Sequence, residues 1–336
     1  MDFKLEPIKE PENEIVVQPV VQPVTSEQPK ENVEVTEKPQ QNVEVPVGSF
    51  NMTSFIVVKD KNYITRSVDA DIKFWAQIDK ETGLPLKPIA LLGESGSGKN
   101  HAIAHYAASM NLPLLVIPCD DSQVLKELLG YWKATAGTTV WCEGLLCQFL
   151  RFPCVIQFDE CNCLPAGRLF MLHELLQNRR LFVKDAPSDQ SIINLHPEVR
   201  LFLSMNPPEA KYSGTNRLNT ALANRTIFIH VPPFKDEEIL NVSTGNAEVD
   251  AKIIHFYKEV SALIKEQKLR ISISKRNIDA MVVGFRNGMG LKNVVMQSFI
   301  NSCLATASET EQKALINTAV LVFGASNFKA EEPKQE

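Results

Sequence analysis

Nine consecutive residues of the chain have the types and spacing that bind phosphate groups. They read Gly93-Glu94-Ser95-Gly96-Ser97-Gly98-Lys99-Asn100-His101. Glycines let successive backbone N–H groups point inward at phosphates, and the lysine that follows them reaches the outer phosphates of a nucleotide. We therefore predict that this segment binds ATP and that Lys99 takes part in its hydrolysis.

Residue 100 departs from the usual form of such a loop, in which a serine or threonine hydroxyl binds Mg²⁺. The residue here is Asn100. An amide oxygen also binds hard cations, although it lies further from the backbone than a hydroxyl does. We expect Asn100 to be a ligand of Mg²⁺, with a geometry different from that of a hydroxyl.

Two adjacent carboxylates follow a later apolar run. Residues 154–158 read Cys-Val-Ile-Gln-Phe, and Asp159 and Glu160 come directly after them. Ligands of parallel α/β sheets bind beyond the carboxyl ends of the strands, so these carboxylates can lie beside the phosphate loop. We predict that Asp159 holds Mg²⁺, directly or through water, and that Glu160 is the base that orients the attacking water.

Two further polar residues complete the predicted catalytic set. Asn206 follows another apolar run and precedes Pro207. It either bonds the attacking water or the γ-phosphate, from the strand between the other two, or begins an Asn-Pro turn. Arg225 precedes the last apolar run. It is either a solvated ion-pair partner or a cation that stabilises the transition state on a neighbour's nucleotide.

These residues require a scaffold in which strands and helices alternate. Short apolar runs predict strands over residues 55–58, 89–92, 114–117, 154–158, 201–204 and 226–230, and a helix over residues 68–79 with Asp69 as its cap. This alternation indicates an α/β fold, a P-loop NTPase parallel sheet with helices on both faces. A Gly/Ser-rich turn that contains a lysine by chance is the alternative for residues 93–99, but the flanking strand and helix argue against it.

Beyond residue 234 the apolar pattern becomes helical. Stripes at helical spacing around Phe256, Ile278 and Leu291 predict a small all-helical lid domain. We expect the α/β domain over residues 49–234 and the lid over 235–326. Residues 1–48 are rich in Pro, Glu, Val and Gln without sustained periodicity, so we expect a disordered tail there and a frayed tail at 327–336.

The bulk composition limits the class of protein. Hydrophobic residues make up 44% of the 336 residues, enough for a full core. The sequence has no apolar run of membrane-spanning length, and its acidic start does not resemble a signal peptide, so we expect a cytoplasmic protein without membrane contact. Seven cysteines without a Cys-x-x-Cys pair are expected to be buried thiols.

The order of these elements resembles that of the AAA+ ATPases, in particular the MoxR/CbbQ-like branch with its dynein-related and cobaltochelatase-subunit relatives. The resemblance covers about residues 50–323. It is carried, besides the phosphate loop, by Leu129-Gly130, Thr139-Val140-Trp141 with Gly144-Leu145-Leu146, Asp159-Glu160-x-Asn162, Leu175-Leu176-Gln177-Asn178-Arg179-Arg180, Asn206-Pro207, and Leu218-Asn219-x-Ala221-Leu222-x-Asn224-Arg225.

The resemblance implies roles for three residues outside the loop. Asn206 is implied to be sensor 1, and Arg225 an arginine finger that acts on the nucleotide of another subunit. Ser274-Lys275-Arg276 is similar to the Ser-Pro-Arg that opens a lid helix, so Arg276 is implied to be sensor 2, which touches the γ-phosphate. Residues 181–195 fall where this branch inserts extra structure before sensor 1.

The resemblance also implies partners. It implies a homo-oligomer, a hexameric ring, with a MoxR-like chaperone role that couples ATP turnover to the remodelling of a protein partner, one class of which carries a von Willebrand factor type A domain. A nucleotide-gated scaffold with little turnover is one alternative, since Asn100 can impair metal binding. A motor on nucleic acid, with Arg179, Arg180 and Lys184 on phosphates, is another, but the net charge of −5 argues against it.

Overall fold

The computed structural model describes residues 51–119, 128–135, 137–164, 170–207, 216, 218, 220–236, 238–266, 268–269, 271–304 and 307–325. The predictions for the two terminal tails, residues 1–48 and 327–336, lie outside these residues. Every element below belongs to the unit that extends from residue 50 onward.

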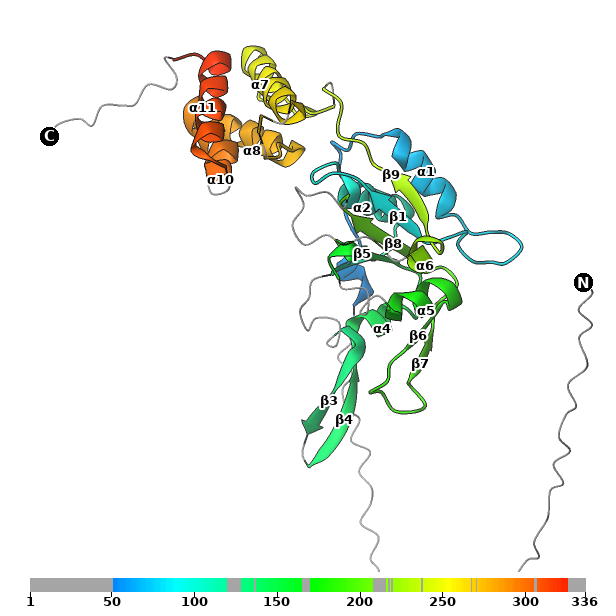
Figure 1. The fold of residues 1–336 in the computed structure, drawn as a ribbon. Helices are drawn as coiled ribbons and strands as arrows, with labels where there is room; N and C mark the ends of the chain where they lie inside the picture. The colour runs from blue at the N-terminus through cyan, green and yellow to red at the C-terminus, as the bar shows by residue number, and fades with distance from the viewer. Residues whose placement is uncertain are drawn as a thin grey trace, which may run out of the picture. The chain divides into compact units, whose positions relative to one another are not determined.

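A five-stranded parallel sheet forms the centre of the first part of the chain (Figure 1). In spatial order its strands are β2 (Leu114–Pro118), β5 (Val155–Asp159), β8 (Arg200–Met205), β1 (Ile89–Leu92) and β9 (Ile227–His230). All neighbouring pairs are parallel. The loop after β1 and the polar residues at the carboxyl ends of β5 and β8 therefore meet at one end of the sheet. Strand β8, which precedes Asn206, lies between β1 and β5, as predicted.

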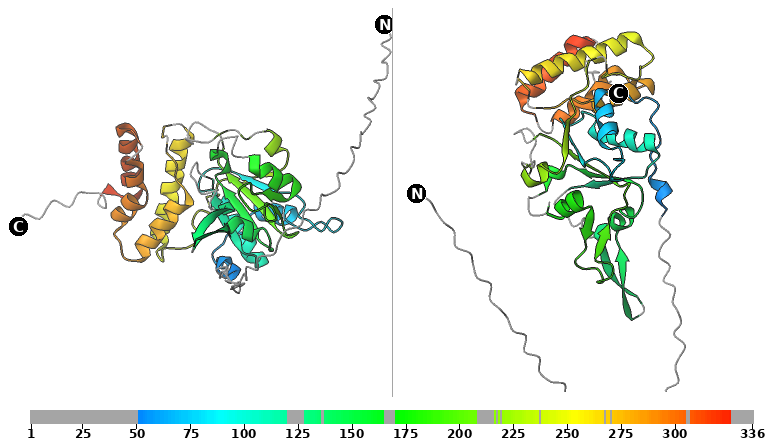
Figure 2. Two further views of the ribbon diagram at one scale, coloured as in Figure 1. Left: turned by 90° about the horizontal axis from the view of Figure 1, so that it is seen from below. Right: turned by 90° about the vertical axis from the view of Figure 1, so that its right-hand side faces the viewer.

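Helices cover both faces of this sheet, which confirms the predicted fold class (Figure 2). On one face, α1 (Ser67–Trp75) and α2 (Lys99–Met110) pack their apolar side chains on β1, represented by Ile72 and Ile103 against Leu91. On the other face lie α4 (Leu145–Phe149), α5 (Phe170–Asn178) and α6 (Thr220–Ala223). Strand residues alternate between these two cores because successive side chains of a strand point to opposite faces.

Among the described residues, two β-hairpins lie outside the central sheet. The longer one pairs β3 (Gly130–Thr135) with β4 (Thr138–Glu143), and the shorter one pairs β6 (Arg180–Phe182) with β7 (Ile192–Asn194). The two hairpins lie side by side (Figure 1). The Trp132 indole N–H in the longer hairpin donates to the carbonyl of Asp185, in the turn of the shorter one, at 2.7 Å. The shorter hairpin occupies the residues where extra structure was expected.

The last part of the chain is helical, as its apolar stripes predict, and has a core of its own. Its helices are α7 (Ala247–Lys265), α8 (Lys275–Arg286), α9 (Leu291–Val295), one π-helical turn (Met296–Ile300), α10 (Asn301–Leu304) and α11 (Glu309–Phe323). Phe256, Ile278 and Phe299 are among the fully buried side chains. We propose residues 234/235 as the boundary between this domain and the α/β domain.

Two local predictions were wrong. Residues 55–58 do not form a strand: the 3₁₀ turn Met52–Phe55 is followed by a single bridge between Ile56 and Pro113. The first helix is α1 over Ser67–Trp75, and Asp69 is its third residue instead of its cap. The Asp69 carboxylate accepts the backbone N–H of Arg66 at 2.6 Å, a bond from within the first turn back to the cap residue.

Candidate functional site

The loop between β1 and α2 turns tightly because glycines occupy positions where a side chain does not fit. Gly96 and Gly98 have φ of 76° and 90°, in the left-handed region that favours glycine. A Cβ added to Gly93 would lie 2.4 Å from the carbonyl oxygen of Val231. Helix α2 begins at Lys99 directly after the loop, and the N-terminal end of a helix favours anions. This backbone geometry suits phosphate groups.

Lys99 joins the loop to the neighbouring strand β8. Its ammonium donates to the carbonyls of Gly93 at 2.8 Å and Glu94 at 2.9 Å, and to Oδ1 of Asn206 at 2.9 Å. The side chain is buried. Lys99 and Asn206, two residues predicted to act on the same phosphates, are thus in direct contact.

Burial lowers the pKa of Lys99 to about 8, against the opposing effect of the Asp159 and Glu160 carboxylates. The free protein therefore loses this proton as the pH rises through about 8. Bound phosphates favour the charged amine, so we predict proton uptake on ATP binding at pH 8.5 and weaker binding at higher pH. Calorimetric titration in buffers of different ionisation enthalpy measures this uptake. Lys99→Arg, which stays protonated, is the control, and equal proton uptake by both proteins would contradict the prediction.

Asp159 at the end of β5 is held by hydrogen bonds to both carboxylate oxygens. Oδ2 accepts from Nδ2 of Asn100 at 2.6 Å, and Oδ1 accepts from Oγ of Ser204 at 2.6 Å. Ser204 is fully buried in β8 and also accepts from Nε2 of Gln157 at 2.9 Å. A chain of polar groups inside the sheet therefore fixes the direction of the carboxylate.

Asn100 and Asp159 fit a magnesium ion by the chemistry of their donors. Mg²⁺ takes oxygen ligands and is usually held by one or two protein groups, with water and phosphate oxygens as the others. Because Asn100 uses its amide nitrogen on Asp159, its Oδ1 is left for a cation. The described residues contain no group of three or more His, Cys, Asp or Glu placed to hold a metal ion.

Leucine is similar in size to asparagine but has no polar side-chain atom. Replacing Asn100 with leucine is therefore expected to weaken the binding of Mg·ATP by about tenfold or more, the range found when groups that support a metal site are removed. Binding of ATP in EDTA should change little, because the loop itself is intact. Asn100→Thr, which restores a hydroxyl, should keep the Mg²⁺ dependence. Titration of ATP with and without Mg²⁺ measures both, and identical Mg²⁺ dependence of the leucine variant would show that residue 100 does not serve the metal.

Glu160 follows Asp159 in an unusual backbone conformation. Its φ of 52° and ψ of 38° are left-handed, and its N–H donates to Oδ1 of Asp159 at 3.1 Å. A residue other than glycine seldom adopts this conformation. The bend turns the chain at the end of β5 and puts Glu160 in the wall of the cavity described next.

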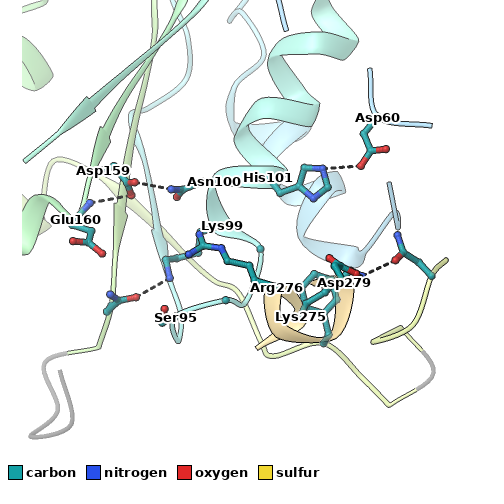
Figure 3. Close-up of a pocket in the computed structure, with 15 residues that line it drawn as sticks. Asp60, Ser95, Lys99, Asn100, His101, Asp159, Glu160, Lys275, Arg276 and Asp279 are labelled. Carbon is teal, nitrogen blue, oxygen red and sulfur yellow. Dashed lines mark hydrogen bonds and ion pairs between the residues drawn. The ribbon is translucent and has the colours of Figure 1, made fainter. Parts of the chain in front are cut away.

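These residues surround one cavity of about 410 Å³ (Figure 3). From the predicted set, the cavity wall contains Ser95, Gly96, Gly98, Lys99, Asn100, His101, Asp159, Glu160, Asn206 and Arg276. Gly93, Glu94 and Ser97 belong to the same loop without lining the cavity. The structure therefore brings together residues from the loop, from the ends of β5 and β8, and from α8.

Arg225, unlike the other predicted catalytic residues, does not line this cavity. It follows α6, and its guanidinium donates to Oε1 of Gln177 at 2.7 Å and to the carbonyl of Ala221. Within one chain its guanidinium is thus bonded to residues outside the cavity that Lys99 and Glu160 line.

Sequence reasoning missed five residues of the cavity wall: Asp60, Phe234, Asn241, Lys275 and Asp279. Asp60 pairs with Nε2 of His101 at 3.1 Å. Lys275 donates to Asn241 and to Asp279, both at 2.6 Å. No short-range pattern marks Asp60 or Asn241, since both reach the site through tertiary packing. Ser204, which bonds Asp159, does not line the cavity, but its polar side chain within an apolar strand was a sign in the sequence of a contact to the site.

Other residues that the sequence analysis considered make contacts outside the cavity. The guanidinium of Arg179, considered for nucleic acid, donates to the carbonyls of His196, Pro197 and Val199 at 2.9–3.1 Å. Of the seven cysteines, five are buried as expected, whereas Cys142 and Cys163 are half-buried.

Among the described residues, no helix is both long and apolar enough to cross a membrane.

Comparison with known proteins places residues 88–226 in a family model described as AAA domain (dynein-related subfamily). The chain is 32% identical to midasin of Dictyostelium discoideum over 54% of this chain, which spans only 3% of midasin. It is 25% identical to protein NorQ of Paracoccus denitrificans, over 70% of this chain and 87% of NorQ. It is 24% identical to protein CbbQ of Hydrogenophilus thermoluteolus, over 54% of this chain and 66% of CbbQ.

Proposed function

We propose, from the premise that residues 88–226 of this chain form an AAA domain of the dynein-related subfamily, that the protein binds ATP with Mg²⁺ and hydrolyses it. The observation that carries the proposal is the single cavity that Lys99, Asp159, Glu160 and Asn206 line together. These are the cation, metal ligand, base and polar sensor that phosphoryl transfer to water requires.

Each residue has a defined task in this proposal. Lys99 holds the outer phosphates once they replace the Gly93 and Glu94 carbonyls as its acceptors. Asn100 and Asp159 would hold the magnesium ion, which would supply positive charge beside the phosphates. Glu160 accepts a proton from the water that attacks the γ-phosphate. Asn206, released from Lys99, bonds that water or the phosphate.

We further propose that the protein acts as a ring of identical subunits, with hexamers as the expected size. The place of Arg225 outside the cavity of its own chain supports an arrangement in which a neighbour supplies its target nucleotide. Arg276, which lines the cavity from α8, would contact the γ-phosphate from the helical domain.

The proposed task of the ring is to remodel or activate a protein partner, in the manner of a MoxR-like chaperone. The resemblance to the MoxR/CbbQ-like branch supports this class of role, and the similarity to NorQ extends over 87% of that protein. A partner that carries a von Willebrand factor type A domain is our specific proposal.

Steady-state release of phosphate from ATP, with and without Mg²⁺, tests the central proposal. We expect Mg²⁺-dependent turnover that Lys99→Ala abolishes. Binding of ATP without turnover would favour a second candidate, a nucleotide-gated scaffold. That candidate is favoured by one observation: the 2.6 Å bond from Asn100 occupies an oxygen of Asp159 that would otherwise be available to the metal.

A further inference from the structure

Arg66 lies at the start of α1, where hydrogen bonds hold its backbone in place. Its N–H donates to Oδ2 of Asp69 at 2.6 Å, and the other oxygen of Asp69 accepts from the Tyr63 hydroxyl at 2.5 Å. Burial and the Asp69 carboxylate raise the pKa of Tyr63 far above its usual value, so the hydroxyl remains a donor. The side chain of Arg66 thus extends from a fixed point.

The guanidinium of Arg66 donates hydrogen bonds to backbone carbonyls of two separate segments. Nη1 donates to the carbonyl of Ser97 in the phosphate loop at 2.7 Å. Nη2 donates to the carbonyls of Pro232 and, at 3.3 Å, Pro233, in the connector between β9 and the helical domain. The carboxylate of Glu238 is 3.8 Å from Nε, and only 8% of the Arg66 side chain is exposed. A buried cation with these acceptors is strongly constrained in position.

Phe234 brings the connector into contact with the same loop. The Arg66 guanidinium carbon lies 4.5 Å from the centre of the Phe234 ring. A Cβ on Gly98 would lie 3.0 Å from the Phe234 ring and 3.7 Å from Nη1 of Arg66. The phosphate loop, the connector and Arg66 are therefore one packed unit.

The start of α8 belongs to this unit as well. A Cβ on Gly96 would lie 2.4 Å from Cβ of Ser274, the residue that caps α8. Lys275 reaches Asn241, whose own amide donates to the carbonyl of Asn62 at 2.6 Å. Arg276, which lines the cavity, is the next residue of α8, so the position of the loop and that of Arg276 are mechanically linked.

We propose that Arg66 is a positioning residue for hydrolysis: its guanidinium joins the Ser97 carbonyl of the phosphate loop to the connector at Pro232–Phe234 and thereby sets the position of Arg276 over the nucleotide. The proposal rests on the proposed ATPase function. It differs from a purely structural role, because Arg66 must then act through Arg276 on turnover.

The test uses the full-length protein with Arg66→Lys and Arg66→Met. Lysine keeps the charge but lacks the planar guanidinium that donates to two segments at once. Methionine has neither the charge nor the hydrogen-bond donors. We expect kcat to fall about tenfold in the methionine variant and less in the lysine variant, a range usual for residues that act as one network. The Kd for ADP should change less than threefold, since the loop and Lys99 remain.

A double-mutant cycle separates positioning from general stability. If Arg66 acts through Arg276, Arg66→Met should have little further effect on kcat in an Arg276→Ala background. The matched control is Arg179→Met, which also removes a guanidinium bonded to three backbone carbonyls, at His196, Pro197 and Val199. Its effect should be additive with that of Arg276→Ala. Full additivity for Arg66→Met would overturn the proposal.

Hydrogen exchange without nucleotide gives a readout that does not depend on activity. The amides of α8 should exchange several-fold faster in Arg66→Met than in the wild type, whereas Arg179→Met should leave them unchanged. Unchanged exchange in α8 would overturn the link from Arg66 to Arg276 even if kcat fell. A wild type that binds no nucleotide would overturn the proposed function, and the coupling to hydrolysis with it, before any variant is compared.

Discussion

Replacing Arg225 with alanine is expected to lower the steady-state rate of ATP hydrolysis by about 10³-fold or more, the effect of removing a finger that stabilises charge in the transition state. Nucleotide affinity should change little, because Arg225 does not line the cavity of its own chain. The substitution removes bonds to Gln177 and Ala221 at a partly exposed position, so thermal stability should fall only slightly. Phosphate release and ADP binding measure these quantities.

Mixing two inactive variants shows whether Arg225 acts across a subunit boundary. A ring that contains Arg225→Ala and Lys99→Ala subunits has some interfaces where an intact loop meets an intact Arg225. Recovery of activity in the mixture would support action in trans, and inactive rings that are verified to be mixed would remove that support. Arg151→Ala, which breaks an exposed ion pair with Glu143, is the matched control and should leave turnover unchanged.

Replacing Glu160 with glutamine is expected to lower hydrolysis by about two to four orders of magnitude, the range for removal of a general base. Glutamine keeps the size and the backbone preference of the residue but cannot accept the proton from water. ATP binding should therefore persist, and the trapped ATP state should favour the assembled ring. Single-turnover hydrolysis and light scattering in ATP measure the two effects.

A control separates the loss of this carboxylate from the loss of any surface charge. Glu174→Gln removes an exposed carboxylate that pairs with Arg180 at 2.8 Å, and it should turn over at the wild-type rate. Wild-type turnover of Glu160→Gln itself would reject Glu160 as the base.

The central sheet was predictable because its three inner strands, β5, β8 and β1, are buried on both faces. The apolar runs at 89–92, 114–117, 154–158, 201–204 and 226–230 each correspond to a strand within one or two residues. Parallel strands enclosed by helices read as continuous apolar segments, and flanking polar residues mark their ends. For the same reason the polar ends of β5 and β8 could be assigned to one edge before the structure was known.

The hairpins escaped prediction because they lack the pattern that reveals a strand. In β3 every residue from Tyr131 to Thr135 is exposed. The strand has no buried face, so its sequence lacks the alternation of apolar and polar residues that would reveal it. Strands β6 and β7 are three residues long, with one buried residue each, Leu181 and Ile193. Gly137, with φ of 83°, was the one local sign of a turn between β3 and β4.

The cavity was predictable where its residues follow strand ends and not where they come from packing. Lys99, Asp159 and Asn206 are fixed by the topology of the sheet. Asp60 and Asn241 reach the cavity wall only because the segment before α1 and the connector after β9 fold back onto the loop. Such approaches depend on side-chain packing over long sequence separations, which local patterns do not encode.

The left-handed backbone at Glu160 affects how stabilised versions of this protein can be sought. A residue other than glycine in that conformation costs about 1–2 kcal/mol, a penalty that glycine does not have. Glycine at position 160 would thus raise the melting temperature while it deletes the carboxylate. A thermostability screen alone would select such a variant, so engineering of this protein needs an activity filter at position 160.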